Sequence, residues 1–153
     1  PAVRGYPPSP VYEKPSPQVE APSEAETKAP SEAETKTPSD SGDRLIAAVI
    51  PLEKKATGYM ASGDLERAET TAERALRLSP NDARLWCLMA EIQLAKENWG
   101  QAEQFAAKSN LLAGSDSGLR AKNWRTIAES LRRRNKPGEA HQAMEKARRL
   151  ESP

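Results

Sequence analysis

The strongest constraint on the fold of this chain is a small residue, Ala68, whose surroundings recur at Ala102 and Ala140. The spacings between these alanines are 34 and then 38 residues. Three further positions keep the same offsets and similar sizes: Leu52, Trp86 and Trp124 lie sixteen residues upstream; Ala56, Ala90 and Ala128 lie twelve upstream; Ala75, Ser109 and Ala147 lie seven downstream. Repeats of this length are typical of helical hairpins that stack on one another.

The alternation of small and large residues has a steric cause. Antiparallel helices approach to about 8–10 Å where small side chains occupy the crossing point. A large side chain from a neighbouring helix then fills the space beside each alanine. We therefore expect an all-α fold of three hairpins, over residues 49–82, 83–116 and 121–152.

Local signals set the ends of these hairpins. Gly63 can adopt a left-handed conformation at the first turn, and Asp64 can cap the following helix. Residues 115–118 are expected to lengthen the second connection by four residues. Residues 43–50 extend the first helix backwards and are expected to cover the end of the stack, while Pro51 either kinks this helix or begins a new one.

The first forty residues have a different composition. They hold nine of the thirteen prolines, almost no large aliphatic side chains, and an octapeptide, APSEAETK, written twice in succession. Such a segment buries too little apolar area to offset the entropy of ordering. Residues 1–42 are therefore predicted to be a disordered tether before a folded domain at 43–153, with a reach on the order of 130 Å if fully extended.

Composition and motifs argue against several functional classes. The single cysteine, Cys87, excludes an internal disulfide, and the sequence has no metal-ligand spacing, phosphate loop or nucleophile motif, so we expect no enzyme activity, metal or cofactor. A net charge of +1 without interleaved exposed aromatics does not favour nucleic acid. The longest apolar run, 45–52, is too short to span a bilayer, so membrane attachment would come only through a lipid anchor upstream of Pro1.

Residues 49–152 resemble three tetratricopeptide repeats, in which a Trp or Leu and then alanines recur in this order. The helix-breaking proline of the pattern is present as Pro80, and Gly114 and Ser152 replace it in the later repeats. Gln93 and Leu131 depart from the pattern, because they replace the aromatic residue found at Tyr59. The resemblance implies a right-handed superhelix that binds another protein on its concave face. The first helix of each hairpin would line that face.

The resemblance also implies which side chains face the partner. In the second and third repeats these are Arg84, Cys87, Glu91, Lys122, Arg125, Glu129, Arg132 and Arg133, with Glu53, Thr57, Met60 and Leu94 completing the face. Residues 118–153 carry ten basic and four acidic groups, so an acidic protein segment is the expected partner. Two alternatives stay open: Cys87 is a small apolar filler, and Arg132 and Arg133 only complement the helix dipole.

Two narrower resemblances bear on the partner. Tetratricopeptide domains that bind chaperone tails hold a carboxylate with asparagines, and Thr57 and Glu91 stand in those positions here, which disfavours this subclass. A proline-rich tether before a compact repeat domain resembles the lipoprotein activators of bifunctional penicillin-binding proteins (Lpo type). That resemblance implies a periplasmic, outer-membrane-anchored protein that stimulates a peptidoglycan synthase. A lipoprotein assembly factor of the pilotin kind and a cytosolic adaptor are the alternatives.

Overall fold

The computed structural model describes residues 38–153, which fold into helices without a strand among them. The helices are α1 (Pro38–Ala61), α2 (Leu65–Leu78), α3 (Ala83–Ala95), α4 (Trp99–Leu112), α5 (Ser117–Arg133) and α6 (Pro137–Glu151). Residues 1–37, with the octapeptide and most of the predicted tether, lie outside the described residues. Helix α1 begins inside the range 1–42 that the sequence analysis assigned to the tether.

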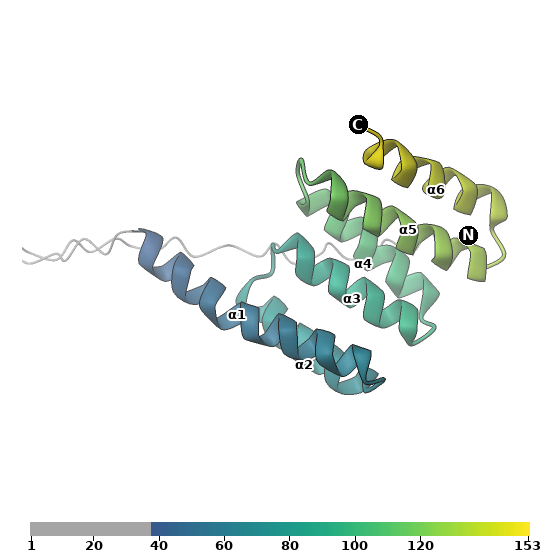
Figure 1. Cartoon of the computed structure of the whole chain (residues 1–153). Helices are drawn as coiled ribbons and strands as arrows, with labels where there is room; N and C mark the ends of the chain where they lie inside the picture. Colours follow the sequence, from purple (N-terminus) through teal and green to yellow (C-terminus); the bar gives the residue numbers. More distant parts are fainter. Residues whose placement is uncertain (1–37) are drawn as a thin grey trace, which may run out of the picture. The chain divides into compact units, whose positions relative to one another are not determined.

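The helices pair in sequence order into three hairpins. Helix α1 packs against α2, α3 against α4, and α5 against α6, while α2 contacts α3 and α4 contacts α5 to join one hairpin to the next. The first helices also contact one another, α1 with α3 and α3 with α5 (Figure 1). This arrangement places the first helices of all three hairpins along one side of the stack.

The repeated small residues lie at the helix crossings, as predicted. Ala68 and Ala102 are fully buried and Ala140 is 8% exposed. Larger side chains fill the space around them: Leu88, Met89 and Ile92 form the core between the first two hairpins, and Ile127 and Leu131 form it between the last two. The tryptophans are half-buried. Trp124 packs against the cluster of the last two hairpins, and Trp86 donates a hydrogen bond through Nε1 to the carbonyl of Pro80 at 2.8 Å.

Helix ends follow the predicted chemistry. Gly63 has a φ of 81°, and Asp64 accepts a hydrogen bond from the backbone N–H of Arg67. Asp82 accepts one from the N–H of Arg84 at 2.9 Å, and caps α3. Side-chain oxygens thus satisfy backbone donors that the first turn of a helix leaves unpaired.

Two predictions about connections are wrong. The four extra residues before the third hairpin do not lengthen a loop, because α5 already begins at Ser117 and takes Asp116 as its cap through the N–H of Leu119 at 2.9 Å. They lengthen the helix instead. Residues 43–50 do not cover the end of the stack: positions 41–48 are exposed, and Val49 is the first buried side chain. Pro51 lies inside a continuous α1.

Gln93, which departs from the aromatic pattern, is a buried bridge between three helices. Its Nε2 donates to the carboxylate of Glu69 on α2, and its Oε1 accepts from Nδ2 of Asn98, the residue just before α4, at 2.8 Å. The same carboxylate also accepts from Nζ of Lys96, which pairs with Glu66 at 2.8 Å. An amide with both ends satisfied therefore replaces aromatic packing here without leaving a buried polar atom unpaired.

Candidate partner-binding face

The candidate face consists of the side chains that α1, α3 and α5 present on the side away from their packing stripes. Helix periodicity brings every third or fourth residue onto this face. Its members come from three helices that lie next to one another, because α3 contacts both α1 and α5. Residues far apart in the sequence therefore share one surface.

Cys87 contributes little to this surface. It is only 2% exposed, so almost none of its side chain is available to a partner. Burial raises the pKa of its thiol to about 11, and the nearby carboxylate of Glu91 raises it further while Lys122 lowers it. The thiol is protonated at neutral pH, which fits the alternative interpretation of Cys87 as an apolar filler.

One turn of α3 after Cys87, an ion pair joins α3 to α5. Nζ of Lys122 lies 2.8 Å from Oε1 of Glu91. Partial burial lowers the pKa of Lys122, but the hydrogen bond to Glu91 and the attraction of neighbouring acidic groups, including Glu53 on α1, together raise it above its ordinary value. The middle of the face is thus electrostatically connected across all three first helices.

At the end of α5, one carboxylate serves two arginines. Glu129 accepts hydrogen bonds from Arg132 at 2.7 and 2.9 Å and from Arg133 at 2.7 Å, and these contacts, that of Arg133 first, lower the pKa of its carboxyl group. The guanidinium of Arg133 also lies 5.4 Å from the ring centroid of Trp99, the first residue of α4. The two cations share a single negative charge, so this corner of the face has a positive excess.

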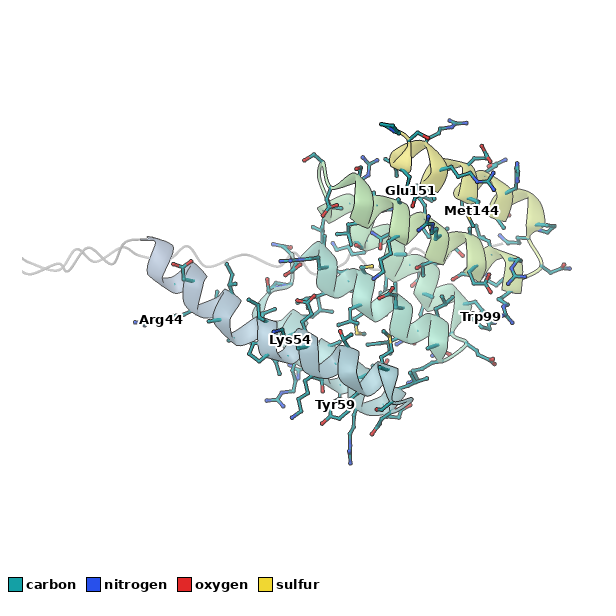
Figure 2. The ribbon with its side chains drawn as sticks, viewed as in Figure 1. Arg44, Lys54, Tyr59, Trp99, Met144 and Glu151 are labelled. Carbon is teal, nitrogen blue, oxygen red and sulfur yellow. The ribbon has the colours of Figure 1, made fainter. Side chains whose placement is uncertain are left out.

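The other two cations of the face are paired with carboxylates that the sequence did not point to. Nη2 of Arg125 contacts Oε1 of Glu151 near the end of α6, and Nε of Arg84 lies 3.8 Å from Oδ1 of Asp82. Figure 2 labels Glu151, the last residue of α6, and Trp99, the first residue of α4. Both guanidinium side chains keep more than half of their surface exposed, 57% for Arg125 and 69% for Arg84.

The remaining predicted members are less available for strong contacts. Thr57 is exposed, but its hydroxyl donates to the carbonyl of Glu53 one turn earlier at 2.9 Å. Met60 and Leu94 are half-buried. The face therefore combines five exposed cationic positions, Lys122 and four arginines, with a modest apolar component.

The apolar end of this surface was not predicted from the sequence. Ile46 and Ile50 lie on the same side of α1 as Glu53 and are 58% and 44% exposed. Ile50 lies three residues before Glu53, and Ile46 lies four residues before Ile50. This helical spacing extends the face toward the N-terminus of α1 by two turns. This spacing is visible in the sequence, but the apolar side chains of residues 43–50 predict equally well a segment that covers the end of the stack.

Within the part of the chain that the structure describes, no helix is both long and apolar enough to cross a bilayer. No cluster of three or more potential metal-ligating side chains occurs there either.

Comparison with known proteins places this architecture in a family. The tetratricopeptide repeat family model matches residues 59–121, from the end of α1 to the start of α5. The globular C-terminal domain of P. aeruginosa LpoP is similar to the chain with 30% sequence identity and a TM-score of 0.64, over 65% of this chain and 94% of that domain.

The chain belongs to the tetratricopeptide repeat family.

The N-terminal domain of stress-induced protein-1 (STI-1) from C. elegans shares the fold, with a TM-score of 0.60 and 16% identity over 71% of this chain and 98% of that domain. No curated protein sequence matches the chain. The predicted all-α fold of tandem tetratricopeptide repeat (TPR) hairpins is confirmed. The TPR domain has a protein-binding role, which agrees with the extended surfaces that stacked repeats provide.

Proposed function

We propose that this protein is a non-enzymatic, tethered binding module that holds and stimulates a peptidoglycan synthase, a bifunctional penicillin-binding protein. In this proposal it is a periplasmic lipoprotein anchored in the outer membrane. The residues before α1 act as the spacer that lets the TPR domain reach its partner.

The similarity to LpoP carries the proposal. It extends over 94% of the globular domain of that protein at 30% identity, which is a likeness of sequence as well as of fold. The chain combines this domain with a proline-rich segment, the architecture by which it resembles lipoprotein activators of the Lpo type. No observation of comparable weight favours a pilotin or a cytosolic adaptor.

The candidate face supplies the proposed contact surface. Arg132 and Arg133 are 65% and 52% exposed and share one carboxylate, so an acidic group of the synthase can approach them. Exposed ion pairs contribute only about 0–1 kcal/mol each, so the partner can displace the internal pairs at small cost. Electrostatic complementarity of this kind mainly sets specificity and association rate.

The experiment measures glycan polymerisation and crosslinking by a purified bifunctional penicillin-binding protein from the same organism, with and without this chain. We expect the full chain to bind the synthase and to raise both rates. The variant Arg132→Gln/Arg133→Gln should lose most of the stimulation while its stability stays within about 0.5 kcal/mol of wild type.

A matched control is available on α6. Arg148 makes the same kind of contact as Arg132, to Glu145 three residues earlier at 2.9 Å, but on a second helix. The variant Arg148→Gln/Arg149→Gln should therefore stimulate the synthase as the wild type does. If the wild-type chain neither binds nor stimulates the synthase, the proposed function is wrong.

A further inference from the structure

The first half of α1 extends beyond the helix that it pairs with. Helix α1 has 24 residues and α2 has 14, and Figure 1 shows the N-terminal part of α1 continuing past the hairpin. Three large aliphatic side chains on this extension stay in solvent: Leu45 is 47% exposed, Ile46 58% and Ile50 44%. Neighbouring exposed side chains of this size mark interaction sites more often than scattered ones do.

These side chains line a pocket between α1 and the beginning of α3. Its volume is about 300 Å³, and its floor is Val49, which is 4% exposed. The walls come from the α1 extension and from the connection after α2, and the pocket is lined by Gly42, Leu45, Ile46, Val49, Ile50, Glu53, Ser79, Asp82 and Arg84. An apolar floor with a few charged groups at the rim is the usual composition of a binding pocket.

The pocket is continuous with the candidate face. Glu53 and Arg84 line the pocket and also belong to that face. Glu53 acts electrostatically on Lys122, which lies two helices away on α5. A bound segment that begins in the pocket can therefore run over α3 to the cations of α5 without leaving the surface.

The exposed charges along this path favour an acidic occupant, because each cation is more exposed than the carboxylate that pairs with it: Asp82, Glu91 and Glu151 keep only 21%, 26% and 37% of their side-chain surface exposed. Arg84, Lys122 and Arg125 keep 69%, 53% and 57% of their side-chain surface exposed. Each pairs with a carboxylate of the domain itself, and a ligand carboxylate can exchange with such exposed pairs at little cost. Arg84 at 3.8 Å from Asp82 is the loosest of these pairs, and it stands at the pocket rim.

We propose that the partner binds through a single segment that inserts a large aliphatic or aromatic side chain between Ile46 and Ile50 and then places a carboxylate against Arg84 and Lys122. The inserted side chain supplies affinity through burial of apolar area. The carboxylate that follows fixes the direction of the segment along the face. This inference rests on the proposed function only in taking the candidate face as the interface.

The first test uses a phage-displayed library of random dodecapeptides, selected on the full chain. The selected peptides should share a large apolar residue followed within a few positions by Asp or Glu. The variant Ile50→Glu should bind them about tenfold more weakly or worse, because it places a charge at the apolar contact. Arg84→Gln should reduce the preference for the acidic residue while keeping that for the apolar one.

Leu111→Glu is the matched control, because Leu111 is 82% exposed on α4, away from the first helices. It introduces the same charge on an exposed aliphatic position and should leave peptide binding unchanged, with both variants unfolding at the wild-type urea midpoint. Selected peptides without the apolar-acidic order, or peptides that bind Ile50→Glu as tightly as wild type, would overturn the proposal.

A second test separates this inference from the proposed function. If the synthase binds wild type and Ile50→Glu equally well, the inference fails and the proposed function stands. If the synthase does not bind but the peptides behave as expected, the proposed function fails and the inference stands. The pocket could instead be filled by a second copy of this chain, and analytical ultracentrifugation tests that alternative. If the full chain is a dimer and Ile50→Glu makes it a monomer, the occupant is a second copy and the proposal is overturned.

Discussion

Each hairpin turn holds one residue in the left-handed backbone region. These residues are Gly63, Glu97 and Asn135, with φ angles of 81°, 62° and 59°, and they occupy equivalent positions of the repeats. The residue after each one donates its N–H to a carbonyl five residues earlier, with N to O distances of 2.9 Å in all three turns. This hydrogen bond belongs to the Schellman motif, which closes a helix most easily with glycine.

Glu97 is the residue that suits this turn least, because its Cβ is crowded in the left-handed region. We expect Glu97→Gly to raise the free energy of unfolding by about 1 kcal/mol, measured by urea denaturation. Asn135→Gly should change it less, since asparagine tolerates this conformation. A Glu97→Gly variant that is less stable than wild type would contradict this account of the turn.

The sequence could predict Gly63 but not its counterparts. Glycine before Asp64 is a direct turn signal, whereas Glu97 has no intrinsic preference for a left-handed backbone. The same limit applies to Gln93, where the pattern expects an aromatic residue. Its role depends on Glu69 and Asn98, which only the fold brings together.

At the scale of helices, the two junctions between hairpins use different chemistry at equivalent positions. In the first junction, Ala75 and Leu85 share an apolar cluster. In the second, Ser109 donates to the carbonyl of Ala83 and accepts from Nδ2 of Asn123, both at 2.7 Å. Ser109 and Asn123 are both fully buried, so this polar contact replaces an apolar one inside the stack.

Removing one side of that contact should be costly. We expect Ser109→Ala to lower the free energy of unfolding by about 1–3 kcal/mol, because Asn123 loses a buried partner. The double variant Ser109→Ala/Asn123→Leu copies the first junction and should recover most of the loss. A double-mutant cycle measured by urea denaturation tests this, and additive losses in the double variant would argue against a shared contact.

The contact between α2 and α3 should make stability depend on pH. The hydrogen bond from Lys96, followed by that from Gln93, lowers the pKa of Glu69 below its ordinary value against the opposing effect of burial. A lowered carboxyl pKa stabilises the fold above the unfolded-state pKa of about 4.3, and that stabilisation is lost as pH falls through the folded-state pKa.

Wild type should therefore exceed Glu69→Gln in unfolding free energy at pH 7, and this difference should shrink as the pH is lowered toward 3. Urea titrations across this range measure the difference directly. Glu73→Gln, an exposed position of the same helix, serves as the reference substitution. A wild-type advantage that stays constant down to pH 3 would show that the ionised carboxylate is not the stabilising species.

The repeat was enough to predict the order of the helices and the buried positions. It was not enough to predict where α1 and α5 begin. The alanine at 68, 102 and 140 marks a crossing whatever surrounds it, so its burial was predictable. By contrast, residues 115–118 carry turn-forming side chains, yet Asp116 caps α5, and Ser117 and Gly118 already belong to that helix. The apolar side chains of the α1 extension suggested burial, but no other helix of the described fold covers most of them.

At the scale of the whole molecule, the candidate face is less basic than the sequence indicated. Counting residues 118–153 gives a large positive excess, but Lys122, Arg125, Arg132 and Arg133 each meet a carboxylate of the domain. Two of these carboxylates, Glu91 and Glu129, were already in the predicted face. Glu151 is on another helix, and its position could not be inferred without the packing of α6 on α5.

The partner is proposed to bind the side of the stack formed by the first helices, α1, α3 and α5. The most direct measurement is a ¹H–¹⁵N NMR titration of the full chain with the purified synthase. Shifts and broadening should concentrate at Ile50, Arg84, Lys122 and Arg125 on α1, α3 and α5, with little change along the outer surfaces of α2, α4 and α6. Perturbations centred on those second helices instead, with the first helices unchanged, would contradict this proposal.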